Sequence, residues 1–80
     1  MNATIYTIDN CIYCVKAKNT LQNRGVMIEE IKVGQDISRE DFLEKFPNVR
    51  TVPQIIIDGK LIGGWDDLRN SEFYANANQG

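Results

Sequence analysis

The spacing of apolar and polar residues predicts two strands joined by a helix in the first part of the chain. Residues 3–8 alternate and are rich in β-branched and aromatic side chains, which is typical of a strand. Residues 12–24 show helical spacing, and Gly25 follows as the residue that ends the helix. The apolar stripe of this helix is Cys14, Ala17 and Leu21. Residues 26–33 form a second strand with weaker alternation, and the pair Asp9-Asn10 supplies turn and N-cap chemistry before the helix.

In the second part of the chain, the residue pattern predicts a helix, a β-hairpin and a last helix. Ser38 caps the helix, with Asp41 three residues on, and Pro47 stops it. Residues 53–57 resemble a buried strand, and Asp58-Gly59 is a hairpin turn leading into the strand 60–62. Gly63 and Gly64 then break the strand, a helix follows over 65–74, and residues 75–80 form a frayed tail.

The predicted order is therefore β-α-β-α-β-β-α in a single domain, residues 1–80. A helix that joins two successive strands makes those strands parallel, whereas a two-residue turn makes the later pair antiparallel. The expected architecture is an α/β fold with a four-stranded mixed sheet and helices on both of its faces.

Composition and charge narrow the class of protein. The chain has 80 residues, of which 42% are hydrophobic, and its net charge is −2, which argues against a nucleic-acid surface. No run approaches the ~20 apolar residues that span a bilayer, and no leader-like segment opens the sequence. We expect a cytoplasmic protein without a membrane partner, and a monomer.

Cys11 and Cys14 lie two residues apart where the first strand gives way to the first helix. Unpaired N–H groups and the helix dipole favour an anion there, so the thiolate of Cys11 is stabilised. In a reducing compartment such a pair is more often catalytic or metal-binding than a structural disulfide. We expect Cys11 to attack a disulfide and Cys14 to resolve the mixed disulfide that forms. A four-ligand metal site within one chain is excluded, because there are two cysteines and no histidine.

Two further motifs carry binding chemistry. Thr51-Val52-Pro53 opens the third strand, and a cis proline there would leave the backbone groups of Val52 available to an extended thiol peptide. A strand that merely starts with proline is the simpler interpretation. Gly63-Gly64 opens the last helix, where N–H groups of Trp65 and Asp66 would bind a carboxylate and the Asp66 side chain an ammonium group. The Trp65 side chain is expected to serve packing.

Together these motifs resemble those of the dithiol glutaredoxins. The matching stretches are Tyr-Thr-x-x-x-Cys-x-Tyr-Cys, Thr-Val-Pro-Gln-Ile-x-Ile-Asp-Gly and Ile-Gly-Gly-x-Asp-Asp-Leu, in that order between residues 5 and 68. The resemblance implies a thioredoxin-like fold and glutathione-dependent thiol–disulfide exchange on protein disulfides and glutathione mixed disulfides. By the family pattern the glutathione groove is lined by Tyr13, Thr51, Val52, Pro53, Gly64, Trp65 and Asp66, with Pro53 cis. Ribonucleotide reductase is a frequent client of such proteins, although nothing in the sequence selects it.

The chain departs from the family pattern at two positions. Ile12 stands where the family has proline, a change that alters redox poise and is found in members that hold a bridging [2Fe–2S] cluster between two chains. Ile8 stands where the family has a lysine or arginine that helps to bind glutathione, and Arg50 is the candidate to supply the lost charge.

Three alternatives therefore stay open at this point. The first is a glutaredoxin-like hydrogen donor recharged by thioredoxin reductase, against which the motif Gly64-Trp65-Asp66 argues. The second is a dimer that binds a [2Fe–2S] cluster, and the third is a non-catalytic interaction domain in which Cys11 would be dispensable.

Overall fold

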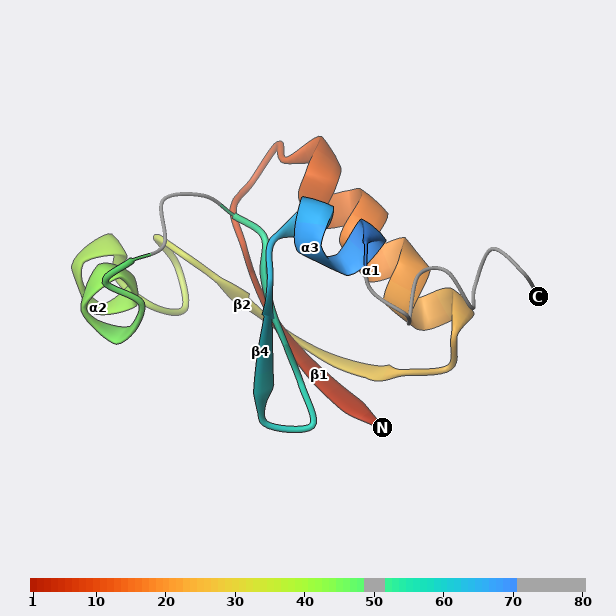
Figure 1. The fold of residues 1–80 in the computed structure, drawn as a ribbon. Helices are drawn as coiled ribbons and strands as arrows, with labels where there is room; N and C mark the ends of the chain where they lie inside the picture. The colour runs from red at the N-terminus through yellow and green to blue at the C-terminus, as the bar shows by residue number, and fades with distance from the viewer. Residues whose placement is uncertain (49–51, 71–80) are drawn as a thin grey trace.

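The computed structural model contains one four-stranded sheet and three helices in the part of the chain that it describes, residues 1–48 and 52–70 (Figure 1). In chain order the elements are β1 (Asn2–Thr7), α1 (Ile12–Asn23), β2 (Met27–Lys32), α2 (Arg39–Lys45), β3 (Gln54–Ile57), β4 (Lys60–Gly63) and α3 (Trp65–Arg69). This is the order that the sequence predicts. No helix in these two described ranges is long and apolar enough to cross a membrane.

The predicted boundaries hold to within a few residues, except at the last helix. The helix predicted over 65–74 ends earlier: α3 stops at Arg69, and Asn70 is its C-cap residue. Residues 71–74 of that prediction, and the frayed tail predicted over 75–80, lie outside the described residues.

The sheet brings the end of β1, the start of β3 and the end of β4 to the same end of the strands, which is one edge of the fold. Its order is β2-β1-β3-β4, with β1 parallel to β2 and antiparallel to β3, and with β3 antiparallel to β4. Tyr6 near the end of β1 pairs with Gln54 at the start of β3, and Gly63 at the end of β4 pairs with Ile55. The segments that follow β1, precede β3 and follow β4 therefore emerge at the same edge. These are the segments that carry the three motifs of the sequence.

The main core lies between one face of the sheet and the helices α1 and α3. Ala3 and Ile5 alternate along β1 toward this face, where they are buried. The other buried members of the core cluster are Ala17, Leu21, Val26, Ile55 and Leu68. Figure 1 shows α1 and α3 together on the same side of the molecule, away from α2.

An aromatic cluster packs α2 against the opposite face of the sheet. Tyr6 points away from Ile5, and its ring centroid lies 5.5 Å from that of Phe42 and 5.1 Å from that of Phe46. Helices therefore cover both faces, as predicted, and the cap of α2 is also the predicted one. The Ser38 side chain accepts a hydrogen bond from the backbone N–H of Asp41 at 3.0 Å.

The two predicted turns are confirmed by their backbone angles. Gly25 follows α1 with φ +75°, the left-handed conformation that glycine adopts without a steric penalty. Asp58 and Gly59 both have positive φ, +50° and +83°, as a two-residue hairpin requires.

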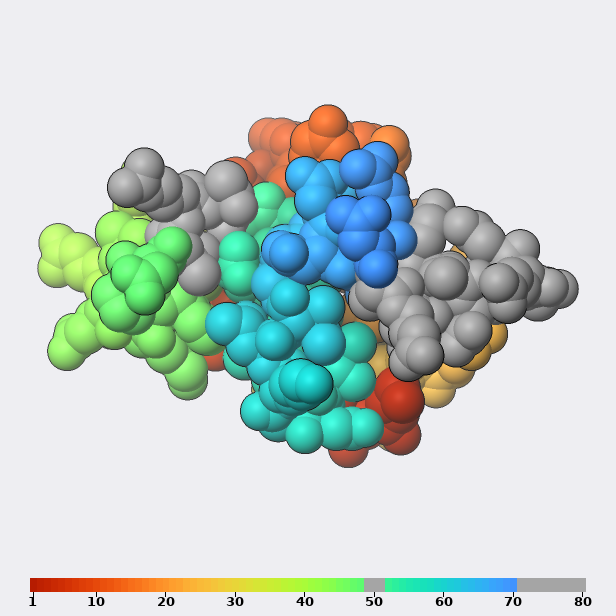
Figure 2. Space-filling model, viewed as in Figure 1, coloured from red at the N-terminus to blue at the C-terminus, as the bar shows by residue number. Residues whose placement is uncertain are grey.

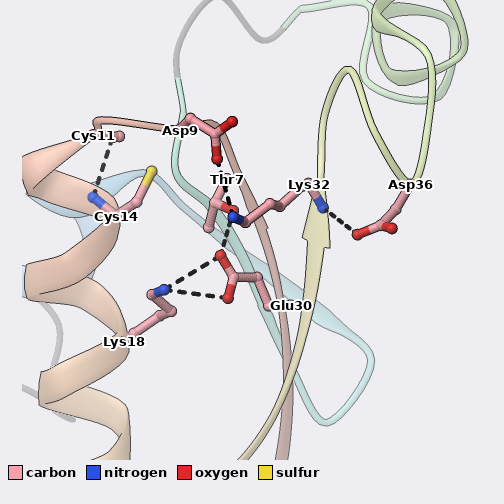
Figure 3. Close-up of polar contacts among 8 residues, drawn as sticks. All are labelled: Thr7, Asp9, Cys11, Cys14, Lys18, Glu30, Lys32 and Asp36. Atoms are coloured by element: carbon pink, nitrogen blue, oxygen red, sulfur yellow. Dashed lines mark hydrogen bonds and ion pairs between the residues drawn. The ribbon is translucent and has the colours of Figure 1, made fainter.

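A charged contact ties β1, β2 and α1 together below the start of α1 (Figure 3). The Glu30 carboxylate accepts a hydrogen bond from the Thr7 hydroxyl at 2.6 Å, and it pairs with the Lys18 ammonium at 3.2 Å. The Thr7 hydrogen bond is the main cause that lowers the pKa of Glu30, and the contact with Lys18 adds to it. The ionised carboxylate is therefore favoured by the fold.

We predict that Phe42→Ala destabilises the protein by about 3 kcal/mol, because it removes a buried ring from the aromatic cluster. Urea unfolding monitored by circular dichroism measures the change. The neighbouring substitution Leu43→Ala is the matched control, since Leu43 is exposed on the same helix, and it should cost less than about 1 kcal/mol. Equal losses in the two variants would contradict the cluster's role.

A second prediction concerns acid stability. Because the pKa of Glu30 is lowered in the folded state, its contribution is present above the unfolded value of roughly 4.3 and is lost as the pH falls through the folded pKa. Wild type should exceed Glu30→Gln by about 1–2 kcal/mol at pH 7, and the difference should shrink as the pH falls below roughly 4.3. Urea unfolding of both proteins at several pH values measures this. A difference that stays constant with pH would mean that the charge on Glu30 does not stabilise the fold.

Candidate active site

The first turn of α1 is built around the sulfur of Cys11. Cys11 itself is the N-cap residue, with extended backbone angles, and its Sγ accepts a hydrogen bond from the backbone N–H of Cys14 at 3.2 Å. The prediction that Asp9-Asn10 supplies the N-cap is wrong. Asn10 instead forms the turn with φ +59°, and Asp9 pairs with Lys32 at 3.0 Å, so neither side chain caps the helix.

The two thiols occupy different environments. Both cysteines are free; Cys11 is half-buried, whereas only 2% of Cys14 is exposed. Burial, together with the hydrogen bond to the Cys11 side chain, raises the pKa of the Cys14 thiol to about 12, although the backbone of Ile8 and the charge of Lys18 act in the opposite direction. Of the two sulfurs, Cys11 is therefore the accessible one, and Cys14 is held protonated at neutral pH.

A groove of about 470 Å³ adjoins the first turn of α1 through Tyr13, which stands between the two cysteines in the sequence. It is lined by Tyr13, Lys16, Val52, Pro53, Gly64, Trp65, Asp66, Asp67 and Arg69. Six of the predicted glutathione-binding residues are thus brought together from α1, the start of β3 and the start of α3. The other two, Arg50 and Thr51, lie outside the described residues.

The groove is close-fitting where β3 approaches α3. The peptide bond between Val52 and Pro53 is cis, and a side-chain carbon added at Gly64 would lie 3.4 Å from the carbonyl oxygen of Pro53. A carbon added at Gly63, which has φ +117°, would collide with the carboxylate of Asp67. In the space-filling view the start of α1 (orange) stands next to α3 (blue) at this edge of the molecule (Figure 2).

Three residues of the groove were not singled out by the sequence. Lys16 lies one helical turn after Tyr13, and its Nζ is 5.6 Å from the centre of that ring. Asp67 accepts a hydrogen bond from the backbone N–H of Gly64 at 2.9 Å, and Arg69 pairs with Asp66 at 3.2 Å. The spacing of an acidic residue three positions after the cap was a usable signal for Asp67. The partners of Tyr13 and Asp66 also follow helical i,i+3 spacing.

A second pocket, of about 540 Å³, lies on the other side of the cysteines. Its lining is Ile8, Asp9, Asn10, Cys11, Ile12, Cys14, Val15, Lys18, Glu30 and Lys32. It shares no residue with the groove, and it includes both cysteines and two residues of β2. Over residues 1–48 and 52–70, no group of three or more histidine, cysteine or acidic side chains is placed to hold a metal ion.

Comparison with known proteins identifies the family. The family model described as Glutaredoxin matches residues 3–62. Glutaredoxin 1 of Rickettsia prowazekii (strain Madrid E) is 46% identical over 70 residues, which are 85% of this chain and 74% of that protein. Glutaredoxin 3 of Escherichia coli (strain K12) is 40% identical over 67 residues, which are 84% of this chain and 81% of that protein.

The fold comparison agrees with the sequence comparison. The crystal structure of glutaredoxin 1 from Francisella tularensis in complex with cacodylate superimposes with a TM-score of 0.75 at 30% identity, covering 98% of this chain and 93% of that one. Both the strand order and the pair Cys11 and Cys14 at the start of α1 fit that likeness. The chain therefore belongs to the glutaredoxin family and has the thioredoxin-like fold that its sequence predicts.

Proposed function

We propose that this chain is a glutathione-dependent oxidoreductase that reduces protein disulfides and glutathione mixed disulfides. Membership of the glutaredoxin family supports thiol–disulfide oxidoreductase activity in general. The observation that carries the dependence on glutathione is the groove beside the cysteines, where six residues predicted to bind glutathione come together from three separate segments. Glutathione is then the co-substrate, and disulfide-bearing proteins are the partners.

Cys11 is the proposed nucleophile because its sulfur is the accessible one and caps α1. The cap hydrogen bond from the Cys14 N–H, and the helix dipole, would stabilise negative charge on that sulfur. The Cys11 thiolate attacks a disulfide sulfur, forms a new S–S bond and displaces the second sulfur as a thiolate, which takes up a proton from water. With a glutathione mixed disulfide, the product is glutathione bound to Cys11, and a second glutathione thiolate releases it as oxidised glutathione.

Cys14 is the proposed resolving thiol for protein disulfides. It must lose its proton and attack the Cys11 sulfur, which releases the substrate's second thiol and leaves a Cys11–Cys14 disulfide. Two glutathiones then reduce that disulfide and become oxidised glutathione. The burial that raises the pKa of Cys14 keeps it from competing with Cys11 for the first attack.

The groove suits the peptide part of glutathione. The backbone groups of Val52 would pair with the cysteinyl residue of an extended tripeptide, while Tyr13 forms the wall next to Cys11. The γ-glutamyl end carries a carboxylate and an ammonium group side by side, and the backbone of Trp65 with the side chain of Asp66 would receive them. Arg50 and Thr51 complete the proposed site.

A coupled assay with a small glutathione mixed disulfide and NADPH tests the proposal. One arm contains glutathione and glutathione reductase, and the other contains thioredoxin reductase alone. We expect turnover in the first arm only, a loss of at least about 1,000-fold in Cys11→Ser, and activity within about threefold of wild type in Cys14→Ser, because a second glutathione replaces the resolving thiol. Reduction of a protein disulfide should be lost in both variants.

The same assay separates the alternatives. Turnover in the thioredoxin reductase arm alone would overturn the dependence on glutathione. Wild-type activity in Cys11→Ser would overturn the role of that residue as nucleophile.

A second prediction addresses the groove. Asp66→Asn should raise the KM for glutathione about fivefold with little change in kcat, because an exposed ion pair with the ammonium group is worth up to ~1 kcal/mol. Steady-state kinetics with varied glutathione measure the change. Glu44→Gln is the matched control, since it removes one negative charge from an exposed position on α2. An unchanged KM in Asp66→Asn would show that glutathione does not meet this carboxylate.

A further inference from the structure

Apart from Cys11 and Cys14, the residues that line the pocket of about 540 Å³ have no role in the reaction described so far. It reaches from α1 to β2, which is one edge strand of the sheet, whereas the glutathione groove reaches from α1 to the segment before β3 and to α3, which follows the other edge strand, β4, in the chain. The two hollows therefore lie on opposite sides of the cysteine pair. A substrate attached to Cys11 can extend into the first of them without entering the groove.

The rim of this pocket is aliphatic and exposed. Ile8 is 45% exposed, Ile12 61% and Val15 46%, and none belongs to the core cluster. Ile12 and Val15 are three residues apart on α1, so they share a face of the helix, and Ile8 lies on the turn that leads to it. Covering such side chains with apolar atoms is favourable by roughly 25 cal/mol per Å².

The charged side chains that line the pocket are paired with one another. Four ionisable acidic or basic side chains line it, and each is paired with another of the four: Lys18 with Glu30 at 3.2 Å, and Lys32 with Asp9 at 3.0 Å. Figure 3 shows both pairs beside α1. The pocket therefore offers a charged group no unpaired side chain of opposite sign, whereas an aliphatic group would leave both pairs intact.

We propose that this pocket binds an aliphatic residue two positions from the attacked cysteine of a protein substrate, and so selects cysteines with aliphatic residues at that spacing. The inference rests on the proposed function, because the peptide that docks here is the part of the substrate that Cys11 attacks. In an extended chain, side chains two residues apart point the same way and are separated by about 6.6 Å, so the residues two positions from a cysteine bonded to Cys11 come to lie over the rim. Ile8, Ile12 and Val15 are then specificity-determining residues rather than catalytic ones.

The chemistry of the attack is unchanged by this docking. The Cys11 thiolate forms a bond to the substrate sulfur, and the other sulfur of the substrate disulfide departs with the electron pair of the broken S–S bond. The pocket affects only how well the attacked half is held during that step. The preference should therefore show in kcat/KM for peptides.

Symmetrical disulfides of a short peptide test the proposal, since either sulfur that Cys11 attacks then belongs to the same sequence. One peptide has leucine two residues before and two residues after its cysteine, and the other has serine at those positions. With glutathione and glutathione reductase present, we expect the leucine peptide to be favoured by about tenfold in kcat/KM, the size of discrimination that one open hydrophobic contact supplies. Ile8→Ser and Val15→Ser should each reduce the ratio to about threefold or less.

Leu43→Ser is the matched control, because Leu43 is 42% exposed and lies on α2, away from the pocket. It should retain the wild-type ratio. No preference in wild type, or a preference that survives in both Ile8→Ser and Val15→Ser, would overturn the proposal. A wild-type dimer that Ile8→Ser converts to a monomer in sedimentation would also overturn it, in favour of a second copy of the chain as the occupant.

A binding measurement keeps the inference separate from the proposed function. In Cys11→Ser, which forms no disulfide at this position, titration with the reduced leucine peptide should shift the methyl resonances of Ile8 and Val15 more than the serine peptide does. If the coupled assay shows no turnover of any disulfide while these shifts appear, the proposed function fails and the pocket remains. If no methyl shifts appear, the pocket proposal fails whatever the outcome of the assay.

Discussion

The hydrogen bond from the Cys14 N–H to the Cys11 sulfur is the constraint on which the site depends. At 3.2 Å it does two things at once: it satisfies one of the unpaired donors that begin a helix, and it fixes the sulfur at the positive end of α1. A serine or aspartate would cap the helix as well, but neither would be a nucleophile toward sulfur. The residue that starts the helix is therefore also the one suited to react there.

Much of the fold and of the site follows from local sequence patterns. The periodicity of apolar residues predicts each strand and helix. Turn residues predict where an element ends, such as Gly25 after α1 and Asp58-Gly59 between β3 and β4. The order of the elements then restricts the sheet, since a helical connection makes β1 and β2 parallel and a tight turn makes β3 and β4 antiparallel. Once the sheet is fixed, Tyr13, Val52 and Trp65 have to emerge at one edge.

The contacts that the sequence did not predict join residues far apart in the chain. Lys18 and Glu30 are separated by 12 positions, and Asp9 and Lys32 by 23, so no periodicity connects either pair. They depend on the register of β2 beside β1, which local patterns do not encode. The N-cap was misassigned for a different reason: Asp9 is the better capping residue by propensity, but the distant Lys32 holds its carboxylate.

The exposed aliphatic residues beside Cys11 do not belong to the buried core, so the stability of the fold does not explain them. Eight large apolar side chains are exposed in the described part of the chain, and Ile8, Ile12, Tyr13 and Val15 form half of them within one short stretch. Tyr13 belongs to the groove, whereas the other three border a pocket whose charges are already paired. Replacing the basic residue and the proline of the family pattern by Ile8 and Ile12 removes a charge and adds apolar area on that side. A partner that covers this area while bonded to Cys11 would account for both departures.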